Sequence, residues 1–257
     1  MRHMLAVQNL GLCMSRNVET GTFSHVACAH TIIGHHCVSL KEVNYLFPLR
    51  LTSDEDELLT ESRVNFSTNI LHHFKDKNIT PEDIFHYIYA IFHSPGYRTR
   101  YAEFLKIDFP RLPLTGNINL FRSLSRLGAE LVSLHLLESP KLDAPITKYI
   151  GARAPEVEKV SWTENTVWLD KAKTTGFAGV REEVWNFHIG GYQVCEKWLK
   201  DRKGRVLTAD DIAHYQKIII ALSETHRLMP QIDHLINSHG GWPGAFQAVK
   251  TMQEEML

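Results

Sequence analysis

The chain has 257 residues, of which 44% are hydrophobic and 22% charged, the ordinary balance of a globular protein with a sizeable core. Its formal net charge is -1, which excludes a binder held to nucleic acid by overall positive charge, so any such contact must come from local basic patches. No run approaches the roughly 18 apolar residues of a membrane span, and Gln8 and Asn9 interrupt the apolar start of the chain, which argues against a signal peptide.

Residues 1–62 are predicted to form a β-rich part. Pro48 indicates an edge strand or a bulge in the last of its strands, and the acidic segment Thr52–Glu61 is expected to be an exposed loop. A chain that enters a core strand so early is expected to be the later part of a longer protein or the partner of a separate subunit. Three runs have the composition of strands: Leu5–Met14, Phe23–Ala29 and Tyr45–Leu51.

Residues 63–138 are predicted to be helical, because from Asn65 onward apolar residues recur at helical spacing. Thr80 followed by Pro81 is typical of an N-cap and the first helical position, and Ser94-Pro95-Gly96 should end that helix. Two further helices are predicted: Tyr97–Leu105 and Leu120–Leu137.

Residues 139–183 are predicted to hold a β-hairpin, and residues 184–237 to be helical again, with Thr208 capping a long helix. Residues 238–257 are expected to be a loosely packed tail. The predicted fold class is α+β, with an N-terminal β-rich part, a mainly helical remainder and a small β-hairpin insertion. The predicted hairpin strands and the helix before the long one are Val157–Trp162, Thr166–Leu169 and Tyr192–Lys200.

Several motifs of enzyme chemistry are missing from the sequence. There is no GxGxxG or GxxxxGK[ST] loop, no GxSxG elbow, and no Asn-Pro-Pro-Tyr/Phe segment of the kind expected in an amino-methyltransferase. We therefore predict that the chain is not an enzyme by itself, has no catalytic residue and no cofactor of its own, and neither methylates nor cleaves DNA alone.

Two Cys and His groupings leave a catalytic alternative open. Zinc takes Cys and His ligands, but adjacent ligands rarely converge on one ion, so half-buried strand residues are favoured and no metal site is predicted. Cys195 lies near His188, but no third orienting residue is indicated, and a buried, inert thiol is favoured. None of the four cysteines forms a CxxC pair, which suits a reducing cytoplasm. The five candidate zinc ligands are Cys28, His30, His35, His36 and Cys37.

Two segments combine basic and aromatic residues, around Tyr97–Tyr101 and within Val184–Arg205. Cations at such places can neutralise phosphates, while aromatic rings anchor the segment or stack on bases, although each charge could instead belong to a solvated helix face. Trp185 and Trp198 are expected to be core anchors. Of the four cations in residues 200–205, the end of the preceding helix is expected to satisfy one or two and the remainder to contact phosphates, and changing Arg202 and Lys203 together is expected to leave folding nearly unaffected. The predicted DNA-binding residues are Arg16, Arg98, Arg100, Lys106, Arg111, Lys197, Lys200, Arg202, Lys203 and Arg205.

Two long blocks carry a family resemblance: FHYIYAIFHSPGYRTRYAEFLKIDFPRLP at Phe85–Pro113 and VWNFHIGGYQVCEKWLKDRKGR at Val184–Arg205. They closely resemble the C-terminal specificity domain of type ISP restriction-modification enzymes. The resemblance implies a target-recognition module that positions an adenine methyltransferase, on the same or a separate chain, on duplex DNA. S-adenosylmethionine would then be bound by that methyltransferase and not by this chain. A helical module that docks a methyltransferase and touches little DNA is the alternative.

Overall fold

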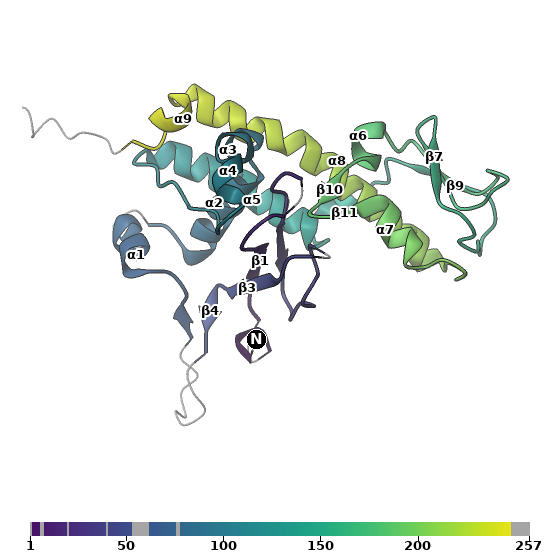
Figure 1. Cartoon of the computed structure of the whole chain (residues 1–257), viewed down its shortest axis with the longest axis horizontal. Helices are drawn as coiled ribbons and strands as arrows, with labels where there is room; N and C mark the ends of the chain where they lie inside the picture. The colour runs from purple at the N-terminus through teal and green to yellow at the C-terminus, as the bar shows by residue number, and fades with distance from the viewer. Residues whose placement is uncertain are drawn as a thin grey trace, which may run out of the picture.

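The computed structural model describes residues 2–5, 8–19, 21–39, 41–52, 62–75 and 78–247. An N-terminal group of strands packs beside a set of helices, and a second group of strands forms a lobe at the far end of the molecule (Figure 1). The helix α8, Ala209–Ser238, runs the length of the molecule between the two ends (Figure 1). The predicted α+β class, with strands first and helices dominating the remainder, is confirmed.

The N-terminal strands form an antiparallel three-stranded sheet in the order β2-β1-β3. The central strand β1 has all five of its residues buried: Leu12 and Met14 pack in the larger hydrophobic core, and the Cys13 sulfur lies beside that of Cys37 on the loop before β3. Pro48 closes the edge strand β3, as its missing amide hydrogen requires. The strands are β1 Gly11–Ser15, β2 Val26–Ala29 and β3 Asn44–Pro48, with the separate short pair β4 Arg50–Leu51 and β5 Arg63–Val64.

The predicted strand Leu5–Met14 is wrong in its first half. Leu5 is 71% exposed, and Arg2–Met4 form a short 3-10 helix, η1. The Asn9 side-chain amide donates hydrogen bonds of 2.8 Å to the carbonyls of His3 and Arg50, so the chain turns before it can pair as a strand. The other two predicted strands also shorten or divide, and the predicted loop beyond Thr52 lies outside the described residues.

The helices after this sheet begin where their capping residues predict. Thr80 accepts from the Asp83 amide while Asp83 accepts from Thr80, which is a complete capping box at the start of α2. The backbones of α2 and α5 are in contact at Gly128. A Cβ there would lie 1.8 Å from the carbonyl oxygen of His86. The predicted single helix Tyr97–Leu105 is two short ones. The bounds are α1 Thr68–Phe74, α2 Pro81–His93, α3 Pro95–Arg100, α4 Ala102–Leu105 and α5 Ile118–His135.

The predicted hairpin exists, within a larger sheet of order β6-β9-β8-β7. Its turn is Glu164-Asn165, with φ of +50° and +58°, the left-handed pair that a two-residue hairpin favours. The strands β6 and β9, each only three residues long, were not predicted from the sequence. The short 3-10 helix η2, Pro140–Asp143, leads into this lobe. The strands are β6 Lys148–Ile150, β7 Ser161–Thr163, β8 Thr166–Trp168 and β9 Gly176–Ala178.

The helix α8 belongs to two hydrophobic cores. Tyr215 and Ile219 near its start pack into the core of the lobe, whereas Leu228 and Ile232 pack with α2 and α5 in the larger core. Trp185 and Trp198 pack in or against the core of the lobe, as predicted for core anchors. How the chain divides into autonomous domains stays a prediction. The remaining elements are α6 Glu182–Trp185, β10 His188–Ile189, β11 Tyr192–Gln193, α7 Val194–Lys200 and α9 Gly241–Gly244.

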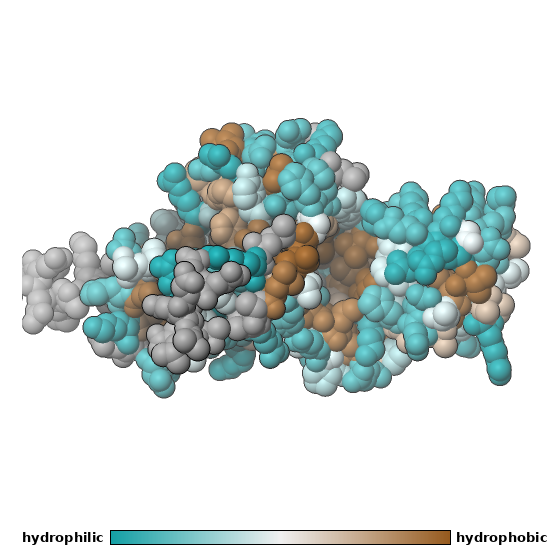
Figure 2. All heavy atoms as spheres, turned by 90° about the horizontal axis from the view of Figure 1, so that it is seen from below, coloured by the Kyte–Doolittle hydropathy of each residue, from teal (hydrophilic) through white to brown (hydrophobic). Residues whose placement is uncertain are grey.

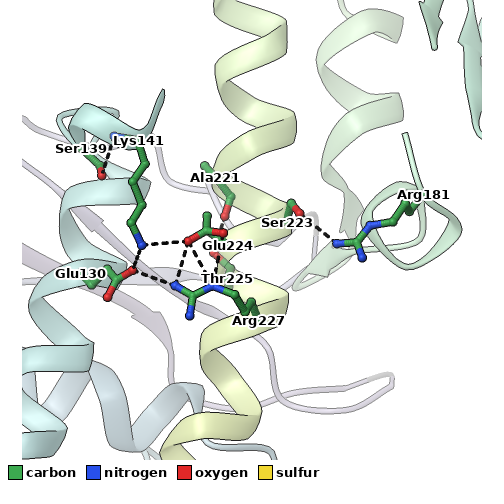
Figure 3. A network of polar contacts seen from close by, with 9 residues as sticks. All are labelled: Glu130, Ser139, Lys141, Arg181, Ala221, Ser223, Glu224, Thr225 and Arg227. Atoms are coloured by element: carbon green, nitrogen blue, oxygen red, sulfur yellow. Dashed lines mark hydrogen bonds and ion pairs between the residues drawn. The ribbon is translucent and has the colours of Figure 1, made fainter. Parts of the chain in front are cut away.

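An ion network fastens α8 to its neighbours (Figure 3). Lys141 pairs with Glu130 of α5 and lies 3.0 Å from the Glu224 carboxylate of α8, while Arg227 lies 3.0 Å from Glu130 and 2.8 Å from Glu224. On the other side of the same helix, Arg181 donates to the Ser223 hydroxyl at 3.0 Å. The helix α8 is thus tied both to the helical core and to the lobe.

The predicted loose tail is wrong for residues 239–247. Ala245 is only 6% exposed, and its carbonyl accepts a 2.7 Å hydrogen bond from Thr115. Trp242 lies against the rings of Tyr97 and Tyr101, with centroids 5.9 Å apart in both cases. These apolar contacts hold the segment after α8 against the helical core, while residues 248–257 lie outside the described part of the chain.

Candidate nucleic-acid interface

The first predicted basic cluster has four exposed cations and one half-buried cation. Arg98 is the exception among its residues, because its Nε donates to the Phe92 carbonyl at 2.7 Å and burial lowers its pKa to about 10. Arg98 is half-buried and bonded to the backbone of its own chain, so it is less available to phosphate than the exposed cations, and its assignment to DNA stays a prediction. The exposed members of the cluster are Arg16, Arg100, Lys106 and Arg111.

Three of these exposed cations gather around Asp108. Arg16 Nε lies 3.1 Å from the Asp108 carboxylate, and the Val18 amide donates to the Lys106 carbonyl at 3.2 Å, which joins the end of β1 to α4. The backbone amide of Phe109 and the Arg16 side chain hold the pKa of Asp108 below its usual value. Arg111 lies over the Phe104 ring at 4.7 Å. Lys106 lies 2.7 Å from the Glu103 carboxylate, so Arg111 is the one of these three cations that has no carboxylate within ion-pair distance among the described residues.

A buried polar network lies behind Arg98 and joins three helices. Tyr89 donates from its hydroxyl to His135 at 2.6 Å, and His135 contacts the Thr225 hydroxyl at 2.8 Å. The His93 ring contacts the Tyr89 carbonyl at 2.7 Å. Burial lowers the pKa of His135 to about 4 and that of His93 well below its usual value, with the Arg98 charge acting in the same direction. These histidines are therefore neutral at pH 7 and serve to join α2, α5 and α8.

The second predicted cluster contains one cation that is structural. The Arg202 guanidinium lies 3.5 Å from the centre of the Trp198 ring and donates to the Trp198 carbonyl at 3.0 Å. This cation–π stack holds the turn after α7 against the core of the lobe. The expectation that changing Arg202 leaves folding nearly unaffected assumed an exposed charge, whereas only 24% of the Arg202 side chain is exposed.

The other cations of this cluster remain at the surface. Lys197 pairs with Asp201, and Lys200 lies 2.8 Å from the Glu196 carboxylate, one helical turn away. Lys203 and Arg205 are exposed, and across the described ranges neither has a carboxylate within ion-pair distance. Lys203 and Arg205 are therefore the cations of this turn most available to phosphate.

Folding brings two further lysines, which were not predicted from the sequence, next to the cations of this turn. Lys159 and Lys171 join Lys203 in lining a surface recess of about 680 Å³, together with Glu156 and Glu158, and Lys171 lies 3.0 Å from the Glu158 carboxylate. Backbone hydrogen bonds build it, because the Val157 amide donates to the Arg205 carbonyl at 3.0 Å and the Lys159 amide to the Leu169 carbonyl at 2.9 Å. We call Lys159, Lys171, Lys203 and Arg205 the lobe cations. The lysines lie 12 and 32 residues apart in the chain, so no local pattern could have grouped them.

A hollow separates the lobe from the N-terminal sheet, and hydrophobic residues gather on its floor (Figure 2). A cavity of about 390 Å³ lies there between the loop that carries His36 and the helix α7. Tyr192 and Trp198 line one side of it, and Val38 lines the other. Lys197 of α7 also lines this cavity, so one of the predicted cations lies beside its aromatic wall.

The Cys and His group in the N-terminal part does not converge. His30 lies against the Asn9 carbonyl at 2.8 Å and the Glu138 carboxylate at 3.2 Å, while Cys28 points toward the Val132 carbonyl. Within the part of the chain that is described, no three Cys, His, Asp or Glu side chains could hold one metal ion. Cys195 is buried and donates to the Val184 carbonyl at 3.7 Å, and burial raises its pKa to about 12, which suits an unreactive thiol.

Comparison with protein-family models decides the family. The model of the Type ISP C-terminal specificity domain matches residues 1–231. The chain belongs to this family. A comparison with curated proteins gave no match. None of the described helices is both long and apolar enough to cross a membrane.

Solved structures share the fold of this specificity domain. The ATP-dependent Type ISP restriction-modification enzyme LlaBIII bound to DNA matches with a TM-score of 0.66 and 18% identity over 88% of this chain. A nuclease-deletion mutant of the Type ISP enzyme LlaGI, in complex with a DNA substrate mimic, has a TM-score of 0.64 and 18% identity over 88% of the chain. A DrdV-DNA complex has a TM-score of 0.63 and 19% identity over 90%. The chain spans 16%, 21% and 25% of these three chains.

Proposed function

We propose that this chain is the DNA target-recognition module of a type ISP-like restriction-modification system. The observation that carries the proposal is the family match over residues 1–231, and the solved structures of similar fold were determined with DNA or a DNA mimic. The lobe cations and the exposed cations around Asp108 give the fold two surfaces with the charge that phosphates need. Phosphate contacts there would fix the position of the module along the duplex, while side chains on turns would read the edges of the bases.

The same proposal assigns the chain a partner. An adenine methyltransferase, on the same or a separate chain, would bind S-adenosylmethionine and modify the base that this module selects. The present chain spans a quarter or less of the similar solved chains, which leaves room for such a unit elsewhere. We expect weak duplex binding by this chain alone and tighter binding beside the methyltransferase, in the cytoplasm where the target DNA would lie. Equal affinity with and without the methyltransferase would contradict the proposal that the two units grip the duplex together.

Salt titration of duplex affinity tests the recognition role. Changing Lys159, Lys171 and Lys203 together to Gln should weaken binding about equally on all sequences. It should also flatten the dependence of log affinity on log salt, by roughly 0.9 unit for each phosphate that the variant no longer neutralises. A triple Gln variant at Lys75, Lys148 and Lys217 removes the same charge outside the recess and should leave the slope nearly unchanged.

The titration also separates the two candidate functions. A helical module that only docks a methyltransferase would show little duplex binding and equal behaviour of the two triple variants. Equal flattening of the slope by both variants would indicate a general charge effect, and the assignment of the lobe cations would then be abandoned.

A further inference from the structure

Two cysteine thiols from different elements lie side by side next to the hollow between the N-terminal sheet and the lobe. Cys13 is in the central strand β1 and is 1% exposed, while Cys37 is exposed on the loop between β2 and β3. Their sulfur atoms are 3.1 Å apart although the residues are 24 positions apart in the chain. Nothing in the proposed DNA-recognition role uses this pair. We propose that Cys13 and Cys37 form a redox-active dithiol that closes to a disulfide.

The two thiols differ in the way that an attacking and a resolving thiol differ. Cys37 is accessible, and hydrogen bonds from the Cys13 thiol and from the amides of Cys37 and Val38 lower its pKa. The hydrogen bond to the Cys37 sulfur and, after it, burial raise the pKa of Cys13. The thiolate is the nucleophile in disulfide exchange, so Cys37 should react first and Cys13 second.

A small-molecule disulfide is the oxidant in this scheme. The Cys37 thiolate attacks one of its sulfurs, a mixed disulfide forms, and one small thiolate leaves. Cys13 then gives up its proton to that thiolate and attacks the Cys37 sulfur, which forms the Cys13–Cys37 bond and releases the second small thiolate. The latter takes up the proton that Cys37 had lost to solvent. Two protein thiols are oxidised and one small disulfide is reduced to two thiols.

The bond would hold in place the loop that contacts the lobe. Tyr192 donates from its hydroxyl to the His36 carbonyl at 3.2 Å. The turn of the β10–β11 hairpin approaches the same loop so closely that a Cβ on Gly190 would lie 1.7 Å from the Val38 carbonyl oxygen, and Gly190 has φ of +55°. The loop that carries Cys37 faces α7 across the cavity. A disulfide between Cys37 and Cys13 would therefore fix this loop to the central strand β1.

The remaining two thiols lack these properties. Cys28 lies 4.0 Å from the Val132 carbonyl, and burial raises its pKa to about 12. Cys195 is fully buried in the lobe with its pKa raised in the same way. Both should stay reduced while the chain is folded, and they serve as internal controls.

The test equilibrates the full folded chain with oxidised and reduced glutathione, then denatures it and alkylates the free thiols with N-ethylmaleimide for mass spectrometry. The oxidised wild type should take up two maleimides rather than four, with the Cys13 peptide linked to the Cys37 peptide. Its melting temperature should exceed that of the reduced form by roughly 5–10 °C, because the bond constrains the unfolded chain.

Two serine variants complete the design. Cys37→Ser changes an exposed residue and should keep the fold while losing the cross-link and the oxidation-dependent rise in melting temperature. Cys28→Ser should retain both. The proposal is overturned if oxidised wild type keeps four alkylatable thiols, carries glutathione on Cys37 without a link to Cys13, or forms a link that Cys28→Ser removes.

Discussion

The two basic clusters look alike in sequence and differ in the folded chain. Around Tyr97–Tyr101, the half-buried member is Arg98, whose charge helps to lower the pKa values of two histidines in the helical core. In the turn after α7, the internal member is Arg202, which stacks on Trp198 at the border of the smaller core and keeps part of its surface in water. In each cluster one arginine serves the fold, and the cations around it remain for a partner.

The difference shows why alternating aromatic and basic residues are an ambiguous signal. In the short helix α3, Tyr97 is buried, and the next residue, Arg98, is half-buried because its side chain turns back to the Phe92 carbonyl. The long aliphatic stem of an arginine can pack inside while its head finds a carbonyl or a ring. Exposure, and not residue type, therefore decides which cations can meet DNA.

The largest expected effect concerns the histidines beside Arg98. The pKa of His135 is lowered to about 4 in the folded chain, against about 6.5 unfolded, so the unfolded state binds more protons between these values. Stability should therefore fall as pH drops from about 6.5 to about 4, with up to roughly 3 kcal/mol from His135 alone. Urea unfolding at a series of pH values measures it.

The matched variants for this test are His135→Gln and His226→Gln. The first removes the half-buried imidazole of His135 and should flatten the pH dependence over that window. The second changes an exposed histidine of α8 and should leave the dependence as in the wild type. If the stability of His135→Gln varies with pH as that of the wild type does, then His135 is not the source of the pH dependence. The contrast drawn between the Arg98 and Arg202 clusters would then lack its electrostatic support.

Sequence patterns could predict the parts of this fold that local physics decides. The capping residues Thr80 and Thr208 mark helix starts, and both carry complete capping boxes. The Glu164-Asn165 turn follows in the same way from the preference of hairpins for left-handed residues. The segment after α8 could not be predicted, because Trp242 is held by rings that lie about 140 residues earlier.

Of the candidate site, only the presence of two segments rich in basic and aromatic residues could be predicted. Patterns found the two basic segments, but they could not separate Arg98 from Arg100, because the choice depends on how α3 sits against α2. They also could not join Lys159 and Lys171 to Lys203, since backbone pairing between distant segments builds that recess. The assignment of individual residues to DNA stays a prediction.

An intermediate effect should separate Arg202 from its neighbour Lys203. Arg202→Ala removes the stack on Trp198 and should lower the free energy of unfolding by about 1–2 kcal/mol. Lys203→Ala removes an exposed side chain and should change it by less than about 0.5 kcal/mol while flattening the salt dependence of DNA binding. Urea unfolding and the salt titration measure the two quantities, and a reversal of the two roles would refute the structural assignment of Arg202.

The smallest expected effect concerns the pair formed by Glu196 and Lys200 on α7. The acid precedes the base by one turn, which is the favourable order on a helix, but the Lys200 side chain is 58% exposed. Lys200→Ala should therefore lower the free energy of unfolding by no more than about 0.5 kcal/mol. In the salt titration it should flatten the slope less than Lys203→Ala, because Glu196 already offsets the Lys200 charge. Glu196→Gln frees that cation and should make the slope steeper. If Lys200→Ala instead flattens the slope as much as Lys203→Ala, then DNA displaces the ion pair, and exposure alone would rank the cations of this turn.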